Sequence, residues 1–185
     1  MARPREFDEV TVLTALRDVF WQHGYEGTSY ALIMEATGLK KGSLYAAFGD
    51  KMSLYMAAIS QYDQEYICEG VKMLRDPTLK PELRIKQLFD GLVEAAGTPM
   101  GRWGCLLCNA ATDLAPFDDK VAETVSKSMN SLKDAIKSCI QNTPAQGQAE
   151  IIWSSYFGGR VLLKSGTSTK NMTLLRDQAL NLLAI

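Results

Sequence analysis

An all-α fold is predicted by three features of this 185-residue sequence. Apolar residues recur at intervals of three and four along most of the chain, which is the spacing of one helix face, and no stretch shows the alternation of a strand. Between residues 28 and 48, two short helical segments flank a glycine, which is the form of a helix-turn-helix. Glycine and proline fall between the periodic segments, where helices end.

The composition is that of a globular protein, with 46% hydrophobic and 22% charged residues. We find neither an apolar run of the ~20 residues that a bilayer requires nor an apolar secretory segment at the start. The four cysteines are then expected to be reduced thiols. These features predict a cytoplasmic protein.

Charge alone gives no support to nucleic-acid binding. The net charge is −1, and residues 1–60 contain six basic against seven acidic residues. The positions of the charges matter more than their sum, because a local basic stripe can follow phosphates on a near-neutral protein. The bases gather in the N-terminal arm, in the second helix of the motif and just after it.

The first helix is expected over residues 8–23, ended by Gly24. Its buried face is formed by Val12, Leu16, Val19 and Phe20. Before it, Arg3 and Arg5 form an arm that can reach a minor groove or phosphate, or can simply fray. The chain's only histidine, His23, is assigned no chemistry.

The helix-turn-helix follows. Thr28 is expected to N-cap its first helix, and Gly38 to end that helix in a left-handed conformation. The second helix, residues 40–48, would turn Leu44 inward and its polar side chains outward. An ordinary helical hairpin with a solvated face remains the alternative at this level.

The flanking sequence carries a specific resemblance. The runs F-x-x-x-G-Y-x-G-T-S, G-x-x-K-G-S-L-Y-x-x-F and K-x-x-L occur in this order within residues 12–56. Their order and spacing resemble the N-terminal domain of the tetracycline-repressor (TetR) family of one-component bacterial regulators. The resemblance implies a homodimer that joins through its last two long helices and binds double-stranded, palindromic operator DNA. In that family the residue at Gly42 permits close approach to DNA, and the hydroxyl at Tyr45 meets phosphate.

Nine residues form the predicted DNA-contacting set. Long cationic side chains suit phosphates and guanine edges, and Lys51 adds a cation at the start of the next helix, where N–H groups also attract phosphate. Ala46 and Ala47 depart from the family pattern and leave fewer side chains to read bases. The set is Arg3, Arg5, Thr28, Lys40, Lys41, Gly42, Ser43, Tyr45 and Lys51.

Two domains are expected: residues 1–49 for DNA binding, and residues 50–185 for effector binding and dimerisation. Helices are predicted over about 50–74, from Pro81, over 105–115, over 118–141, from Pro144, and over 170–183. Apolar faces on the last two helices and the Gly158–Gly159 pair suggest a dimer seam, although these faces could also close the protein's own core. The seam residues expected are Gly158, Gly159, Leu162, Leu175 and Ala179.

A thiol pair marks the effector domain. The segment G-C-L-L-C-N from Gly104 resembles a TetR subgroup with G-C-L-x-x-N, some members of which sense electrophiles or oxidants through the first cysteine. At a helix start beside Arg102, Cys105 would favour thiolate and could form a disulfide with Cys108. Two packed apolar side chains are the alternative. We predict neither a metal nor a cofactor, because a structural zinc site needs four ligands.

Aromatic residues of the second domain are the other effector candidates, since ligand pockets are mostly apolar. Most of them could equally be core. The predicted effector set is Tyr62, Tyr66, Phe89, Trp103, Cys105, Cys108, Trp153 and Tyr156.

The resulting hypothesis is a DNA-binding transcriptional regulator, a repressor released by a small-molecule or thiol-reactive effector. A helical Cys-x-x-Cys redox protein, or an interaction module without DNA binding, is the alternative. An enzyme is not expected, because the chain offers no nucleophile–base pair and its single histidine lies in the DNA-binding part.

Overall fold

The computed structural model describes residues 7–183, and every regular element in that range is a helix. The chain divides into two compact units, Met1–Gln64 and Glu65–Ile185. We call them the N-terminal and the C-terminal unit and describe each by itself. The division lies 15 residues beyond the expected boundary at 49/50, because the helix that follows the motif packs on the first helix.

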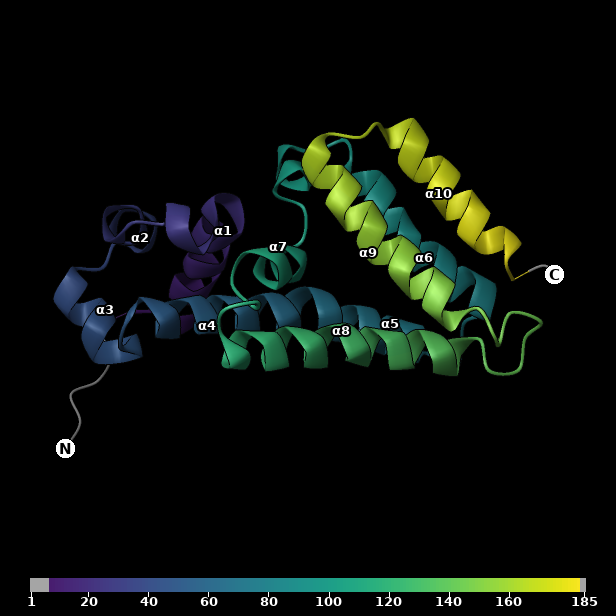
Figure 1. The fold of residues 1–185 in the computed structure, drawn as a ribbon, viewed down its shortest axis with the longest axis horizontal. Helices are drawn as coiled ribbons and strands as arrows, with labels where there is room; N and C mark the ends of the chain where they lie inside the picture. The colour runs from purple at the N-terminus through teal and green to yellow at the C-terminus, as the bar shows by residue number, and fades with distance from the viewer. Residues whose placement is uncertain (1–6, 184–185) are drawn as a thin grey trace. The chain divides into compact units, whose positions relative to one another are not determined.

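The N-terminal unit contains α1 (Glu9–Gly27), α2 (Tyr30–Thr37), α3 (Lys41–Phe48) and α4 (Lys51–Tyr62). Helix α1 packs against α2 and α4, and α3 packs against α4 (Figure 1). Its fully buried apolar side chains include Leu16, Phe20, Ile33, Leu44 and Leu54. The helical spacing of apolar residues therefore identified the buried face of α1 correctly.

Short polar residues and glycines set the helix ends in this unit. The carboxylate of Asp8 accepts hydrogen bonds from the backbone N–H groups of Val10 and Thr11, at 3.3 Å each, and begins α1. Gly24, at φ 71°, interrupts the helix where its end was expected, and one further turn follows. Gly38 ends α2 at φ 69° and ψ 3°, the predicted left-handed cap.

The prediction for the start of α2 was wrong by one residue. Ser29 is the N-cap, since its hydroxyl accepts a hydrogen bond from the backbone N–H of Leu32 at 3.2 Å. The Thr28 side chain is fully buried, and its hydroxyl donates to the Gly24 carbonyl at 2.6 Å. Thr28 therefore closes the turn between α1 and α2 from inside.

The helix expected over residues 50–74 is present, with an irregular middle. Asp50 caps α4 by accepting from the Ser53 N–H at 2.8 Å. A π-helical segment, Asp63–Cys68, then separates α4 from α5 (Glu69–Leu74). The boundary between the two compact units falls inside this π-helical segment.

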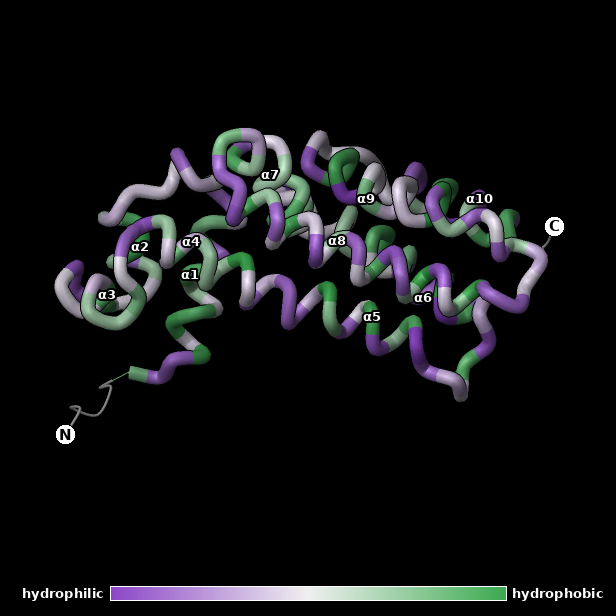
Figure 2. The backbone as a smooth tube through the Cα atoms, turned by 60° about the horizontal axis from the view of Figure 1, so that its bottom comes forward, coloured by the Kyte–Doolittle hydropathy of each residue, from purple (hydrophilic) through white to green (hydrophobic). Residues whose placement is uncertain are grey.

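The C-terminal unit continues with α6 (Pro81–Ala95), the 3-10 helix η2 (Pro99–Trp103), α7 (Leu106–Asp113), α8 (Asp119–Cys139), α9 (Ala149–Ser165) and α10 (Thr169–Asn181). Helix α6 contacts both α9 and α10, while α8 contacts α5, α7 and α9 (Figure 1). Hydrophobic and hydrophilic stretches alternate along α5, α6 and α8 (Figure 2), as expected for helices that bury one face.

One local prediction in this unit needs correction. Pro144 does not begin a helix, because α9 starts at Ala149. Successive tight turns fill the gap, with backbone bonds from Gln146 to Thr143 at 3.2 Å and from Gln148 to Ala145 at 2.8 Å.

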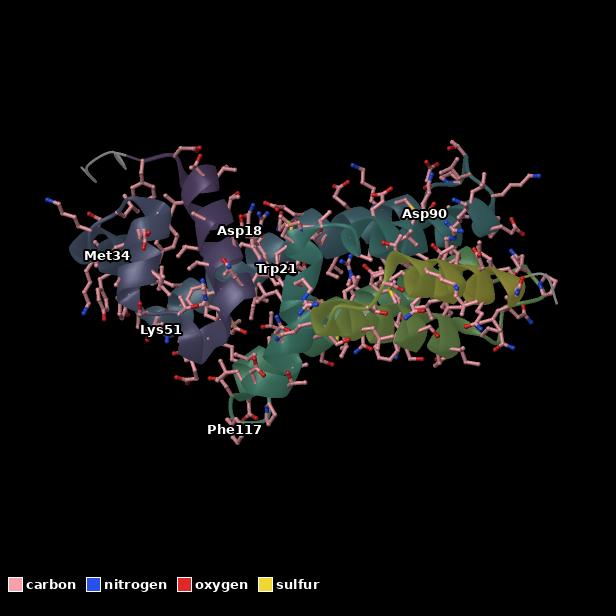
Figure 3. The ribbon with its side chains drawn as sticks, turned by 90° about the horizontal axis from the view of Figure 1, so that it is seen from above. Asp18, Trp21, Met34, Lys51, Asp90 and Phe117 are labelled. Carbon is pink, nitrogen blue, oxygen red and sulfur yellow. The ribbon has the colours of Figure 1, made fainter. Side chains whose placement is uncertain are left out.

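An ion-pair group joins α6 to α10. Asp90 (labelled in Figure 3) accepts hydrogen bonds from Lys86 at 2.6 Å and from Arg176 at 3.0 Å. Burial alone would raise the pKa of Asp90, but these two cations hold it below its usual range. Within residues 7–183, we find no helix that is both long and apolar enough to cross a membrane.

Candidate nucleic-acid interface

Helix α3 presents one polar face to solvent. Leu44 is fully buried and fixes the helix on the N-terminal unit, while the side chains on the opposite face are exposed. The exposed residues include four of the predicted contacts: Lys40, Lys41, Ser43 and Tyr45. A short helix of this kind, held by one inward side chain, is the element that enters a major groove in helix-turn-helix proteins.

Two tyrosines and a lysine tie α3 to α2. The rings of Tyr30 and Tyr45 stack with centroids 5.4 Å apart and an interplanar angle of 23°. The Lys41 ammonium lies 4.7 Å from the Tyr30 ring centre and 5.6 Å from that of Tyr45. We call these three residues the tyrosine–lysine cluster. It holds a cation at the exposed start of α3.

The phenol of Tyr30 remains protonated in this cluster. Burial raises its pKa to about 12, helped by the hydrogen bond with Tyr45 and by the negative charges that Tyr45 and Asp50 can carry. A neutral Tyr30 leaves the positive charge of Lys41 uncompensated by a phenolate. The cluster therefore offers hydrogen-bond donors and one cation, which suits phosphate oxygens.

A second cation lies at the start of α4. The Lys51 ammonium is 4.5 Å from the Tyr25 ring centre, so its position is also set by an aromatic face. It belongs to the first turn of α4, where backbone N–H groups and the helix dipole favour an anion. Figure 3 labels Lys51 on this unit.

The fold leaves room for a larger side chain at Gly42. A Cβ atom built at this position would meet no other heavy atom within 4 Å. Glycine in a helix interior costs about 0.5–1 kcal/mol relative to alanine, so the fold gains nothing from it. A close approach by something outside the described chain would account for it.

Three further residues were predicted to contact DNA: Thr28, Arg3 and Arg5. Thr28 is buried with its hydroxyl bonded internally, so its side chain serves the fold and is not presented to a ligand. Arg3 and Arg5 lie outside the described residues.

The aromatic residues proposed to line an effector pocket are mostly core. Phe89 is fully buried, with its ring centre 6.0 Å from that of Tyr156. The indole N–H of Trp153 donates to the Met129 carbonyl at 2.9 Å. Tyr62 belongs to the N-terminal unit, where it packs edge-on against Trp21 at 4.9 Å, and this corrects its assignment to the effector domain.

The remaining candidates are less enclosed. The Tyr66 hydroxyl lies 4.0 Å from the sulfur of Met100, and the Trp103 ring is half-buried. A hollow of about 350 Å³ is formed by the ends of α6 and α9 and by η2, and its lining includes Pro99, Arg102 and Leu163. None of the eight predicted effector residues lines it.

The thiol pair occupies the start of α7, as predicted. Cys105 is the N-cap residue and is 1% exposed, while Cys108 is half-buried one turn later. The hydrogen bond with Cys105, burial and the charge on Cys105 hold the pKa of the Cys108 thiol far above its ordinary value, against the opposing pull of Arg160 and Lys164. The Cys108 thiol therefore keeps its proton.

The sequence did not indicate all the cations near these thiols. The guanidinium of Arg102, which was expected to favour the Cys105 thiolate, packs over Gly166, where a built Cβ would lie 1.7 Å from its Nη1. Arg160 and Lys164 of α9 act on Cys108. Their spacing of four residues places them on one helix face, but nothing in the sequence indicated that this face meets α7.

The residues predicted for the dimer seam fall into a buried and an exposed group. Gly159 is buried in its own unit, where a Cβ would lie 2.7 Å from a Leu92 methyl and 2.9 Å from a Leu175 methyl. Ala179 is 3% exposed. Gly158 and Leu162, by contrast, are exposed on the outer face of α9. Three further exposed apolar residues of α9 and α10 are Ile151, Val161 and Leu174.

Among residues 7–183 we find no group of three or more His, Cys, Asp or Glu side chains placed to hold a metal ion.

Comparison with known proteins agrees with this geometry. The profile described as "Bacterial regulatory proteins, tetR family" matches residues 12–58. The transcriptional repressor ComR of Escherichia coli K12 is 31% identical over 132 residues, which are 71% of this chain and 62% of ComR. The uncharacterized regulator YezE of Bacillus subtilis 168 is 29% identical over 148 residues, or 80% of this chain and 76% of YezE. This chain therefore matches somewhat less than two thirds of ComR.

A solved structure matches nearly the whole chain. The TetR-family regulator CifR, as a cysteine mutant complexed with 26-bp operator DNA, superposes with a TM-score of 0.79 at 28% identity. The match covers 97% of this chain and 98% of CifR. A helix-turn-helix unit followed by a helical unit is the arrangement that this chain has in common with these regulators. Residues 12–58 match the TetR family of bacterial regulatory proteins, and over most of its length the chain is similar to regulators of that family.

Proposed function

We propose that this protein is a transcriptional repressor that binds double-stranded operator DNA through α3 and the start of α4. The observation that carries the proposal is the exposed face of α3, where Lys41 is held on two stacked tyrosine rings beside a glycine that the fold does not need. ComR is named a repressor, and CifR is complexed with operator DNA. Binding to chromosomal DNA would place the protein in the cytoplasm.

A homodimer would read a palindromic operator with one α3 per half-site. The support for a dimer is the exposed apolar face of α9, where Ile151, Val161 and Leu162 are 52%, 55% and 47% exposed. Exposed large apolar side chains that gather on one helix suit a protein–protein contact. We assign the seam to this face and to Gly158, because Gly159 and Ala179 are already covered within the chain.

The effector acts in the C-terminal unit, at the thiol pair of α7. Cys105 is the N-cap of α7, a position that favours thiolate, and it follows Gly104, which packs against Arg160 and Lys164 of α9. Modification of a residue that is only 1% exposed would require the start of α7 to shift. Such a shift is the conformational difference that releases DNA, since an effector switches only if it favours one state.

DNA binding is tested with the sequence upstream of the protein's own gene. Fluorescence anisotropy with a labelled duplex, at several salt concentrations, should give specific binding whose affinity falls as salt rises. A scrambled duplex of equal length is the control. Equal affinity for both duplexes at every salt concentration would remove the proposal of a specific operator.

The thiol proposal is tested separately. Treatment with peroxide or N-ethylmaleimide should weaken operator binding by the wild type and leave that of Cys105→Ser unchanged. Mass spectrometry identifies the modified sulfur. If Cys105 is modified and operator affinity does not change, the thiols are core residues and the effector acts without a covalent bond.

A further inference from the structure

The thiol pair of α7 lies against a cationic turn of α9. Gly104, at φ 75°, brings the chain so close that a Cβ there would lie 3.0 Å from Lys164 Cβ and 3.3 Å from the Arg160 carbonyl oxygen. Cys105 is the next residue. The start of α7 and the Arg160–Lys164 turn are therefore neighbours through direct backbone packing, and a glycine makes that approach possible.

Hydrogen bonds hold the polar groups around the pair in place. Asn109 donates from its side-chain amide to the Trp103 carbonyl at 3.1 Å and accepts from the Lys164 ammonium at 2.8 Å. Arg160 donates from Nε and Nη2 to the Tyr156 hydroxyl at 3.1 and 2.8 Å. These hydrogen bonds fix the positions of the Arg160 and Lys164 side chains.

Two cationic side chains act on the thiol pair. Arg160 and Lys164 both favour the charged form of Cys108, against the burial and the hydrogen bond that raise the pKa of its thiol. Cys108 and Arg160 are half-buried and Lys164 is exposed, so the cluster opens to solvent on the Lys164 side. A part-buried pair of cations attracts an approaching anion more strongly than a solvated pair does.

We propose that this thiol pair is selective for anionic electrophiles, small molecules with a carboxylate a few bonds from an electrophilic carbon. Arg160 and Lys164 bind the carboxylate and so bring the carbon to the sulfur. The inference rests on the proposed function only in placing the effector at these thiols. It adds the chemical class of that effector.

The covalent step is an ordinary thiolate reaction. The thiolate sulfur attacks the electrophilic carbon and forms an S–C bond. In a displacement, the carbon–leaving-group bond breaks and the leaving group departs with the electron pair. In a conjugate addition, the π pair moves to the α-carbon, which takes a proton from water. The carboxylate stays ionised in either case.

Iodoacetate and iodoacetamide provide a matched pair of probes. Both lose iodide to a thiolate, but only iodoacetate carries a negative charge. The alkylation rates at Cys105 and Cys108 are measured by peptide mass spectrometry on the folded protein. The ionised fraction of a thiol affects both rates equally, so it cancels in the ratio of the iodoacetate rate to the iodoacetamide rate. The ratio therefore reports how strongly the site attracts the anionic reagent.

The ratio should fall about tenfold when both cations are removed in Arg160→Gln/Lys164→Met. It should also fall in the wild type as salt rises, because salt screens the charges. Lys170→Met removes an exposed cation of α10 and is the matched control, which should leave the ratio unchanged. Arg160→Lys keeps the charge and should retain most of the selectivity, which guards against a double variant that misfolds.

Two results would overturn the proposal. One is an unchanged ratio in Arg160→Gln/Lys164→Met with both alkylation rates lowered equally. The cations would then favour ionisation of the thiol without attracting the anionic reagent. The other is alkylation that occurs after unfolding but not in the folded wild type. The alkylation assay involves no DNA, so its result is independent of the proposed repressor function. The thiols could be selective in a protein that is not a repressor, and a repressor could lack this selectivity.

Discussion

The Lys41 ammonium lies 4.7 Å from the centre of the Tyr30 ring, and so joins the first turn of α3 to the first turn of α2. A cation on an aromatic face gains about 0.5–1 kcal/mol at an exposed site. The contact also restricts a long side chain before DNA arrives, which lowers the entropy lost on binding. Lys51 is held in the same way on Tyr25. The aromatic residues of the N-terminal unit thus position its cations as well as filling its core.

Removal of these two cations should weaken DNA binding without regard to sequence. In Lys41→Ala and in Lys51→Ala, the slope of log affinity against log salt should fall by about 0.9, the value for one lost phosphate contact. Fluorescence anisotropy over a salt series measures it. Lys120→Ala, at an exposed position of α8, is the control. An unchanged slope in both variants would exclude these lysines from the interface.

Replacement of Gly42 should separate folding from DNA binding. Gly42→Ala should stabilise the N-terminal unit by up to about 1 kcal/mol, because the Cβ meets nothing and alanine favours the helix. Operator affinity should nevertheless fall, since the methyl group would occupy the space that DNA approaches. Thermal unfolding and anisotropy give the two quantities. Undiminished affinity would show that DNA does not come close to this residue.

The raised pKa of Tyr30 predicts a loss of stability at high pH. The folded protein holds the Tyr30 proton up to about pH 12, whereas the unfolded chain releases it near pH 10. The stabilising contribution is therefore complete below pH 10 and is lost as pH rises to 12. Denaturant unfolding from pH 9 to 12 should show a smaller decline for Tyr30→Phe than for the wild type. Equal declines would contradict this assignment.

A charge on the outer face of α9 should separate the proposed dimer. Leu162→Glu places a carboxylate where we expect an apolar seam, and an unpaired buried charge is costly. Leu83→Glu is the matched control, because Leu83 of α6 is equally exposed, at 47%. Sedimentation at micromolar concentration should show monomers of the first variant and dimers of the second. A wild-type monomer would refute the dimer itself.

Gly159 should matter to the fold of a single chain. The methyl group of Gly159→Ala would lie 2.7 Å from Leu92 and 2.9 Å from Leu175, so side chains must shift and about 1–3 kcal/mol of stability is lost. Gly91→Ala, where a Cβ meets nothing within 4 Å, should instead be neutral or stabilising. Chemical unfolding of both variants provides the measurement. Equal stability of the two variants would mean that the contacts of α9 with Leu92 and Leu175 relax without cost.

The sequence by itself determined the features whose causes are local. Asp50, Gly38 and Pro81 act on their own backbone or on that of the next turn, so they marked the ends of helices correctly. Helical periodicity identified Leu16 and Leu44 as core for the same reason. The motif of residues 12–56 also led to the right family, because its spacing is a property of the chain alone.

Tertiary structure decided everything that depends on a partner from another element. Thr28 and Ser29 are both possible caps, and only the burial of Thr28 against α1 selects Ser29. Arg102 is close to the thiols along the chain, whereas Lys164 is 56 residues beyond Cys108 and comes near it only because Gly104 packs on α9. A residue's neighbours along the chain follow from helix geometry, whereas contacts between helices depend on how whole faces pack, which a pattern of single residues does not specify.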